Sequence, residues 1–319
     1  MNNTFKFSAR ATAAAAVLAL GSSAFALTFD ANIEIDSIHK SGSALTEAQT
    51  GLSQGGRVEF NASGKVGADM FVTGRATLLA LQSGAAATDD MWIQVGSAKG
   101  AVKLGRFEAA DLFPIANDAM VAHAASVYYN NDMRGRSAFA TGSPFHAAGT
   151  LNLGSGLSLE VGVMQSKGTG DAAGVRPVLS YASGPLNLSV GFESGKYQGS
   201  DNNVSGAGAT VGYKIGAVKL TGNVSKGKTN SALANNNKSA YALTVATGGF
   251  AAGMIAGSTD NVLGGEDKVQ TGYVAYTMPL FDLKGATVTP AFSSSTAKNS
   301  TLDTNVSLTG FNLRLDYAF

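Results

Sequence analysis

The chain has 319 residues; about one in eight is glycine and 14% are charged, against ordinary shares of about 7% and about 25%. It contains no cysteine, which excludes a disulfide framework, a cysteine-ligated metal site and a cysteine nucleophile. A hydrophobic content of 45% argues against intrinsic disorder, and a formal net charge of +1 gives no overall attraction to nucleic acid.

The first 26 residues have the pattern of a secretory signal peptide. Lys6 and Arg10 precede an apolar run over 11–20, and Ala24-Phe25-Ala26 matches a cleavage site with small residues. A membrane anchor is the alternative, but the run is about half of the ~20 residues that a spanning helix needs. We therefore expect cleavage after Ala26 and a single mature domain over 27–319.

From residue 27 onward, apolar and polar residues alternate with a period of two. Residues 27–36 (LTFDANIEID) place apolar side chains mainly at odd positions and polar ones at even positions. The same pattern returns at 58–66, 157–163, 186–193, 218–225 and 311–319. A period of two predicts β-strands with one apolar and one polar face, and no helical period is evident.

Two kinds of connection alternate along the chain. Tight turns, mostly glycine-containing, are expected at 67–68, 98–100, 154–156, 184–185, 216, 248–249 and 280–285. Longer polar loops are expected at 39–55, 82–90, 108–143, 167–174, 196–203, 228–237, 261–266 and 298–303. Seven turns and eight loops predict sixteen strands.

Short turns at one end and long loops at the other are typical of an outer-membrane barrel. Because lipid cannot hydrogen-bond a free strand edge, the sheet must close, so 27–37 is expected to pair with 304–319. A soluble β-sandwich is the alternative, since the period alone does not say which face is buried. Sixteen strands enclose a lumen too wide for side chains to fill. We therefore predict an all-β, transmembrane antiparallel barrel of sixteen strands with short periplasmic turns.

Two short motifs support a family resemblance. Residues 101–107 read AVKLGRF, and the chain ends LDYAF at 315–319. Together with the signal peptide and sixteen strands, they resemble the Gram-negative general porins, especially those of beta-proteobacteria. The resemblance implies that Tyr317 and Phe319 are an assembly signal for the barrel-assembly machinery. It also implies a homotrimer in the bacterial outer membrane, with Gly105-Arg106 opening a long third loop that folds into the lumen.

The segment 108–143 is the constriction loop in this interpretation. Its alanines are small enough to pack against an inner wall, and 116–127 has room for a short helix. Many porins carry a Pro-Glu-Phe-Gly turn at the tip of this loop, and none occurs here, so the narrowest geometry stays open. Carboxylates on the loop and cations on neighbouring strands would create a transverse field across the pore. The candidate constriction residues are Arg57, Arg75, Lys103, Arg106, Glu108, Asp111, Asp118 and Arg134.

Other side chains receive plainer interpretations. Glu34, Asp36, Glu160 and Glu193 are expected to be solvated lumen wall. Candidates for an aromatic girdle, with ordinary lipid-facing packing as the alternative, are Trp92, Tyr213, Tyr241, Tyr273, Tyr317 and Phe319. His39, His123 and His146 show no metal-ligand spacing, so we expect no metal and no cofactor.

The function expected from these features is passive diffusion of small hydrophilic solutes and ions through a water-filled outer-membrane channel. The cations near the third loop favour a weak preference for anions. A substrate-specific channel of the same architecture and a surface adhesin-like barrel are the alternatives. An enzyme is not expected, because no nucleophile elbow or phosphate-binding loop occurs in the right context and the histidines do not converge. No nucleic-acid partner is expected.

Overall fold

The computed structural model describes residues 25–116, 121–135, 145–166, 172–197, 203–230, 235–260, 265–299 and 303–319. Most of the expected signal peptide lies outside these residues, while Phe25 and Ala26 begin the first strand. Within the described residues, no helix is long and apolar enough to cross a membrane.

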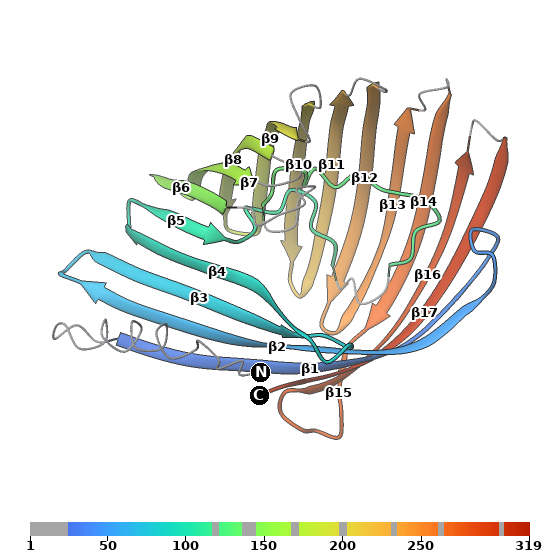
Figure 1. Ribbon diagram of the computed structural model, residues 1–319, viewed down its shortest axis with the longest axis horizontal. Helices are drawn as coiled ribbons and strands as arrows, with labels where there is room; N and C mark the ends of the chain where they lie inside the picture. The colour runs from blue at the N-terminus through green and yellow to red at the C-terminus, as the bar shows by residue number, and fades with distance from the viewer. Residues whose placement is uncertain are drawn as a thin grey trace, which may run out of the picture.

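The described chain forms a single antiparallel sheet (Figure 1). Its strands are β1 (Phe25–Ser41), β2 (Gln49–Val66), β3 (Met70–Ala80), β4 (Ala86–Ser97), β5 (Gly100–Arg106), β6 (Phe145–Gly154), β7 (Leu157–Ser166), β8 (Ala172–Ser183), β9 (Leu186–Tyr197), β10 (Asn203–Ile215), β11 (Val218–Asn230), β12 (Asn235–Thr247), β13 (Phe250–Asp260), β14 (Glu266–Tyr276), β15 (Met278–Pro279), β16 (Ala286–Asn299) and β17 (Thr304–Ala318). β15 has only two residues and pairs with β16 beside β14, so the sheet has the predicted sixteen full-length strands.

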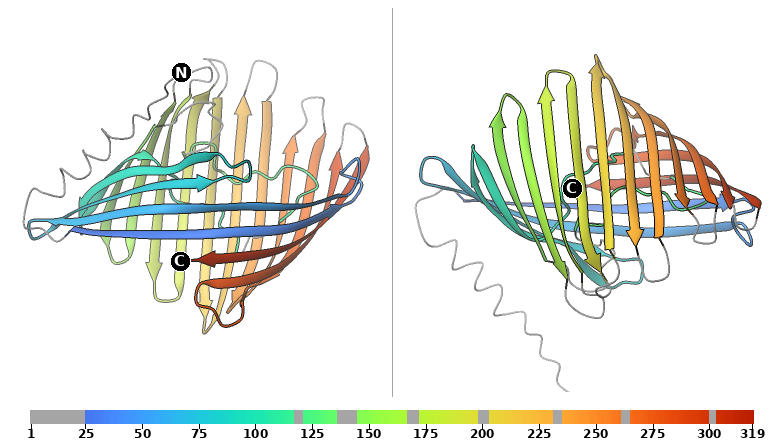
Figure 2. Two further views of the ribbon diagram at one scale, coloured as in Figure 1. Left: turned by 60° about the horizontal axis from the view of Figure 1, so that its bottom comes forward. Right: turned by 90° about the horizontal axis from the view of Figure 1, so that it is seen from above.

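The sheet closes on itself because β1 pairs with both β2 and β17. β1 (blue) and β17 (dark red) lie side by side in Figure 2, and their register runs from Asn32↔Ala318 to Ser41↔Thr309. The Ala31 and Phe319 backbones exchange two further hydrogen bonds of 2.9 and 2.8 Å. The predicted pairing of the first and last segments is confirmed.

All seven predicted turns separate consecutive full-length strands. The strands extend into the predicted loops at the other end, except at the third loop, where β5 ends at Arg106 and β6 begins at Phe145. The first loop was expected over 39–55, but β1 continues to Ser41, β2 begins at Gln49, and His39 pairs with Thr50. Polar residues in these stretches do not end the strands, because cross-strand pairing satisfies their backbone groups.

The apolar face of the wall points outward. Leu27 and Phe29 are 52% and 61% exposed, and Ile33 and Ile35 are exposed beside them. The alternating Asn32, Glu34 and Asp36 instead contact polar partners on β17. Exposed apolar rows on a closed sheet exclude the sandwich alternative, in which these rows would form the core.

Two aromatic residues do not lie in the expected girdle. Trp92 faces the lumen, where the Lys103 ammonium lies 4.0 Å and the Arg75 guanidinium carbon 5.9 Å from its ring centroid. Tyr273 is only 5% exposed and packs beneath the third loop. The exposed rows Met91–Ile93–Val95 and Val274–Tyr276 occupy the outward positions of β4 and β14, so their neighbours must point inward.

Candidate functional site

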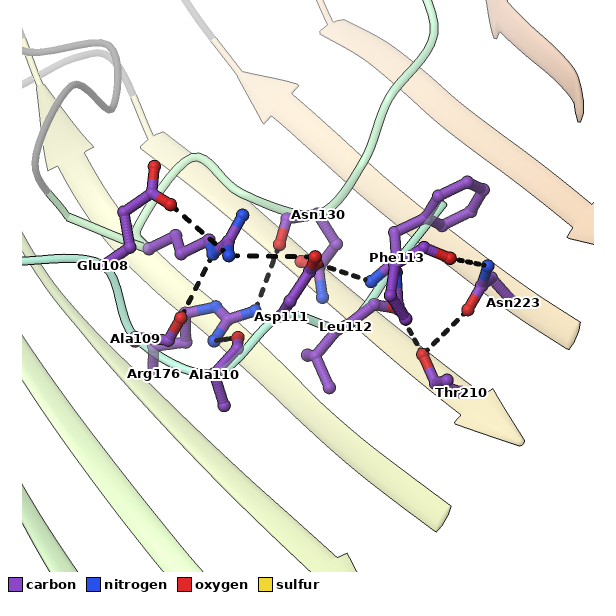
Figure 3. A network of polar contacts seen from close by, with 12 residues as sticks. Glu108, Ala109, Ala110, Asp111, Leu112, Phe113, Asn130, Arg176, Thr210 and Asn223 are labelled. Atoms are coloured by element: carbon purple, nitrogen blue, oxygen red, sulfur yellow. Dashed lines mark hydrogen bonds and ion pairs between the residues drawn. The ribbon is translucent and has the colours of Figure 1, made fainter. Parts of the chain in front are cut away.

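The third loop, between β5 and β6, has its two ends held together. Glu108 and Gly135 form a β-bridge, and the Ala109 N–H donates to the Arg134 carbonyl over 2.8 Å. The Arg134 guanidinium reaches the carboxylates of Glu108 at 3.4 Å and Asp111 at 3.7 Å (Figure 3). The loop therefore leaves the wall and returns to it beside an ion cluster.

The departure point requires a glycine. Gly105 has a φ of 132°, and a side chain there would meet the Met91 carbonyl on β4. Phe107 then turns inward, where its ring stacks on His146 with 4.1 Å between centroids. The Gly-Arg motif singled out in the sequence thus marks the place where the chain bends into the barrel.

From there the loop runs along the inner wall, in front of β10–β14 in Figure 1 (green). Backbone carbonyls of the outgoing half accept hydrogen bonds from wall side chains. The pairs are Leu112 with Thr210 at 2.9 Å, Pro114 with Asn223 at 2.9 Å, and Ala116 with Tyr273 at 2.8 Å (Figure 3 shows the first two). Over 112–116, this segment has no helix or strand of its own. Wall side chains therefore supply the hydrogen bonds that its backbone carbonyls need.

The stretch around Ala122 and Ala124 is also held by wall side chains, here through its N–H groups. The Ala122 and Ala124 N–H groups donate to the Ser293 and Ser295 hydroxyls on β16, over 3.0 and 2.9 Å. Residues 121–127 form no helix, so the helix expected over 116–127 is wrong for this part; 117–120 and Asp118 lie outside the described residues. The spacing of serines on one face of a strand, two residues apart, suits an extended chain instead.

A buried ion pair anchors the centre of the loop. Arg176 on β8 and Glu193 on β9 are 0% and 1% exposed, with 3.5 Å between Nε and Oε2. The Arg176 guanidinium donates to the carbonyls of Ala110 at 2.7 Å and Asn130 at 3.3 Å (Figure 3). One wall side chain therefore holds the outgoing and returning segments together.

Glu193 completes the anchor from the neighbouring strand. Its carboxylate accepts from the Tyr128 hydroxyl at 2.7 Å and from the N–H groups of Asp132 at 3.2 Å and Met133 at 3.0 Å. Glu160 on β7 similarly accepts from the Ala110 N–H at 2.9 Å. The interpretation of Glu160 and Glu193 as solvated wall is therefore wrong, because the loop covers them.

Glycines in the wall make room for the loop. A side chain on Gly195 would meet Met133, one on Gly206 or Gly227 would meet Tyr128, and one on Gly208 would lie 2.7 Å from the Asn130 amide. These glycines form a shallow strip across β9, β10 and β11, which we call the glycine seat. Part of the high glycine content of the chain thus serves close approach of the loop to the wall.

Burial shifts the titration of two groups in the anchored loop. Burial raises the pKa of Asp132 to about 6, repulsion by Glu193 adds to the rise, and Lys238 opposes it. The pKa of the Tyr128 hydroxyl is also raised, by burial and by Glu193, so it remains a donor. Since the docked loop holds the Asp132 proton more tightly than a free loop, docking is favoured below the ordinary Asp pKa of 3.8 and weakens as pH rises through about 6.

A second cluster lies farther along the loop. His123 bridges the Thr271 hydroxyl at 2.7 Å and the Tyr129 hydroxyl at 2.6 Å, joining the outgoing and returning segments to β14. Burial lowers the pKa of His123, which favours the neutral ring that this bridge uses. The described residues contain no cluster of three or more His, Asp or Glu arranged to hold a metal ion.

The wall away from the loop, formed by β1–β5 and β17, carries charges of both signs on its inner face. Arg75 lies 3.4 Å from Glu59 and 4.0 Å from Asp90, and Arg57 lies 3.2 Å from Glu59. The charged side chains on this inner face include Asp30, Glu34, Asp36, Glu59, Asp90 and Asp316 among the acids and Arg57, Arg75, Lys103 and Arg314 among the bases. This wall lies across the interior of the barrel from most of the third loop (Figure 1).

The structure describes seven of the eight candidate constriction residues, all but Asp118, and distributes them over several places. Glu108, Asp111 and Arg134 form the cluster at the loop ends, and Arg57, Arg75 and Lys103 face the lumen from the wall. Arg106 pairs in register with outward-facing Met91, and its Nε donates to the Asp89 carbonyl over 2.7 Å. It therefore lies at the base of the loop on the other side of the strand.

Sequence reasoning missed the anchor itself. Arg176 had no assigned role, although it is a long cation among small residues (AAGVRP at 172–177) on a polar face. Two inward groups of opposite charge on adjacent strands, surrounded by inward glycines, would have been the available signal. The contact needed the cross-strand register, which alternation alone does not provide.

No family model and no curated protein matches the chain. Solved structures do: an anion-selective porin from Comamonas acidovorans superimposes with a TM-score of 0.71 at 15% identity, covering 93% of this chain and 100% of that one. This chain has the fold of the sixteen-stranded porins. Among other porin-like barrels, the outer membrane protein OmpT of Vibrio cholerae gives 0.74 at 12% identity over 94% and 99% of the two chains. Salmonella typhi OmpF gives 0.63 at 12% over 91% and 97%.

Proposed function

We propose that this chain is an outer-membrane porin that lets small hydrophilic solutes and ions diffuse passively through a water-filled lumen. The observation that carries the proposal is the combination of an apolar outer wall with a polar inner wall lined by charges on β1–β5 and β17. Water wets that inner wall, and lipid suits the outer one. Its porin fold supports the outer membrane as its location, after removal of the signal peptide over 1–26.

Sieving by size and charge needs no catalytic group. The third loop docked on β8–β16 takes up part of the lumen, and the opposite wall presents paired charges across the remaining space. We propose that this gap is the constriction, with Glu108, Asp111 and Arg134 on one side and Arg57 and Arg75 on the other. The protein is then a channel without enzymatic activity, and the porin fold supports assembly as a homotrimer.

The weak preference for anions expected from the sequence is kept. At the proposed constriction, the three cations Arg57, Arg75 and Arg134 outnumber the two loop carboxylates Glu108 and Asp111. On the wall opposite the loop, Lys40 and Lys65 occupy inward register positions in addition to the charged residues named above, so carboxylates are not in surplus there. Rings of charged side chains set ion preference in pores, so the constriction should favour anions weakly.

Planar-bilayer recording of the refolded protein tests the channel directly. We expect stepwise conductance increments and, in a salt gradient, a zero-current potential of the sign given by anions. Repeated recordings without any steps, from protein shown to be folded, would remove the channel proposal. Clear cation preference would leave the channel intact and refute only the assignment of its charge preference.

Arg57 is the cation on this wall best placed to act on passing ions, because its side chain is 47% exposed. Arg57→Gln should raise the cation-to-anion permeability ratio about sevenfold, since removing a unit charge about 7 Å away lowers the energy of a cation in water by about 0.6 kcal/mol and raises that of an anion by the same amount. The measurement is the zero-current potential. Lys268→Gln, which removes an exposed lysine already paired with Glu266, is the control and should change nothing; an equal shift in both variants would contradict the assignment.

Tyr317 and Phe319 are proposed to form the signal for assembly by the barrel-assembly machinery. Their exposed rings lie 5.4 Å apart at the seam with β1, on the outer side of the barrel. Deleting Phe319 should remove most of the assembled barrel from cells while leaving refolding in detergent largely intact. Phe311→Ala removes an outward ring from the same strand and serves as the control; normal barrel levels after the deletion would refute the signal.

A further inference from the structure

The outer wall carries a basic groove near its long-loop end. Lys226 and Lys228 on β11 lie on the same face of the strand as Leu220. The alternating residues Ser225 and Gly227 face the third loop instead. Both lysines therefore point away from the lumen. Within the described residues neither forms an ion pair, unlike the outward lysines Lys268 and Lys298, which contact Glu266 at 3.0 Å and Asp303 at 3.6 Å.

Polar groups surround the two lysines on neighbouring strands. The cross-strand partners are Ala207 and Ser239 for Lys226, and Ser205 and Asn237 for Lys228. The two lysines line a groove of about 710 Å³ with Ser205, Asn237, Ser239, Phe192, Ser194, Tyr241, Ser258 and Asp260. The Asp260 carboxylate at its far edge accepts from the Asn237 amide at 2.7 Å, so it already has a partner.

The groove lies where the residues of the outer wall change from apolar to polar. One outward position closer to the short turns, the same face carries Val190, Val224 and Tyr241. Exposed Phe192 lies in the row of Lys226, two strands away across Ala207. Aromatic rings mark the boundary between hydrocarbon and headgroups, and a lipid-facing lysine costs about 2–4 kcal/mol at the bilayer midplane but little at that boundary. The lysines therefore lie at headgroup level, at the end of the barrel that carries the long loops.

We propose that Lys226 and Lys228, with the hydroxyls of Ser205 and Ser239, bind a phosphate group on the headgroup of an outer-leaflet lipid. Two unpaired ammonium groups beside hydroxyl donors complement a phosphate, and the apolar rows below the groove suit the acyl chains of the same molecule. The inference rests on the proposed outer-membrane location. It adds a lipid site on a face that does not contact the lumen.

Native mass spectrometry of the full refolded protein with bisphosphorylated lipid A tests the site, with dephosphorylated lipid A as the matched probe. The K226Q/K228Q double variant should bind the phosphorylated lipid about thirtyfold more weakly, while its binding of the dephosphorylated probe stays unchanged. K226R/K228R should retain binding. K268Q/K298Q, which removes two outward lysines that already have carboxylate partners, should also retain it.

Several results would overturn the proposal. Unchanged binding by K226Q/K228Q, or an equal loss in K268Q/K298Q, would show that the groove is not the site. Displacement of the lipid by millimolar inorganic phosphate alone would show a site for free phosphate, and an altered oligomeric state in the variant would show a face that pairs with a second copy. Single-channel conductance of K226Q/K228Q should match the parent, so a failure of the channel proposal and a failure of the lipid site are separately visible.

Discussion

Replacing Arg176 by Met should release the third loop from the inner wall. The substitution removes the donor that joins the Ala110 and Asn130 carbonyls and leaves the Glu193 carboxylate buried without its cation. Breaking a buried ion pair by removing one partner costs about 3–5 kcal/mol, which is comparable with the total stability of many domains. Because the barrel wall has its own backbone ladder, we expect the loss to fall on loop docking rather than on the strands.

Two measurements report the release. Trypsin should cleave after Arg134 in the variant much faster than in the parent, since Arg134 is held by Glu108, Asp111 and the Ala109 carbonyl only while the loop is docked. Single-channel current should fluctuate, because a free loop in the lumen obstructs it intermittently. Arg314→Met is the control, since it breaks the contacts with Asp36 and Glu34 on the opposite wall without touching the loop.

A double variant separates the charge from the shape. Glu193→Gln alone leaves the Arg176 cation buried without an anion, and R176M/E193Q removes both charges. If the pair acts as a unit, the double variant should be less damaging than the sum of the two single variants. Simple additivity, or a parent-like loop in Arg176→Met, would show that the pair does not anchor the loop.

A substitution in the glycine seat is the second change that we expect to disturb loop docking strongly. Gly227→Val places a branched side chain against the Tyr128 ring, which must then leave the wall. That movement breaks the bonds from the Tyr128 hydroxyl to Glu193 at 2.7 Å and from the Ser225 hydroxyl to the Tyr128 carbonyl at 2.6 Å. Overpacking of this kind costs about 1–3 kcal/mol, in addition to the lost hydrogen bonds.

Gly222→Val on the same strand is the matched control. Gly222 lies on the outward face of β11, where a side chain would meet no atom within 4 Å. Valine also suits a strand better than glycine, so this variant should be neutral or slightly stabilising. Proteolysis after Arg134 and current noise should rise in Gly227→Val only; the same behaviour in both variants would mean that general changes in the strand, rather than contact with the loop, are responsible.

The close approach of the loop to the wall also explains part of the glycine content. Where the structure describes it, the loop has no helix, so its backbone needs the strands within reach, which Gly206 and Gly208 allow on β10. Serine and threonine hydroxyls on the wall, such as Thr210 and Ser293, then satisfy the loop's backbone groups. The inner face of β8–β16 therefore holds most of the loop, while Ala122 and Ala124 also pack with Ile38 on β1 and Leu308 on β17.

The sequence by itself determined the sixteen strands, the seven tight turns, the closing pair and the outward direction of the apolar rows. Each follows from a local rule: a period of two, a glycine that accepts a left-handed turn, and the need of lipid-exposed backbone for a closed sheet. The same rule placed Trp92 inside, beside Gln94 and between Met91 and Ile93, although its aromatic character suggested the girdle.

Only the tertiary structure decided the path of the third loop and the partners of its charges. Arg176 and Glu193 meet each other because β8 and β9 are adjacent. They meet Asn130 and Met133 because a segment 46 to 60 residues earlier in the chain lies on them. Such contacts depend on register and on a loop without a repeating pattern, and neither is encoded in the alternation of neighbouring residues.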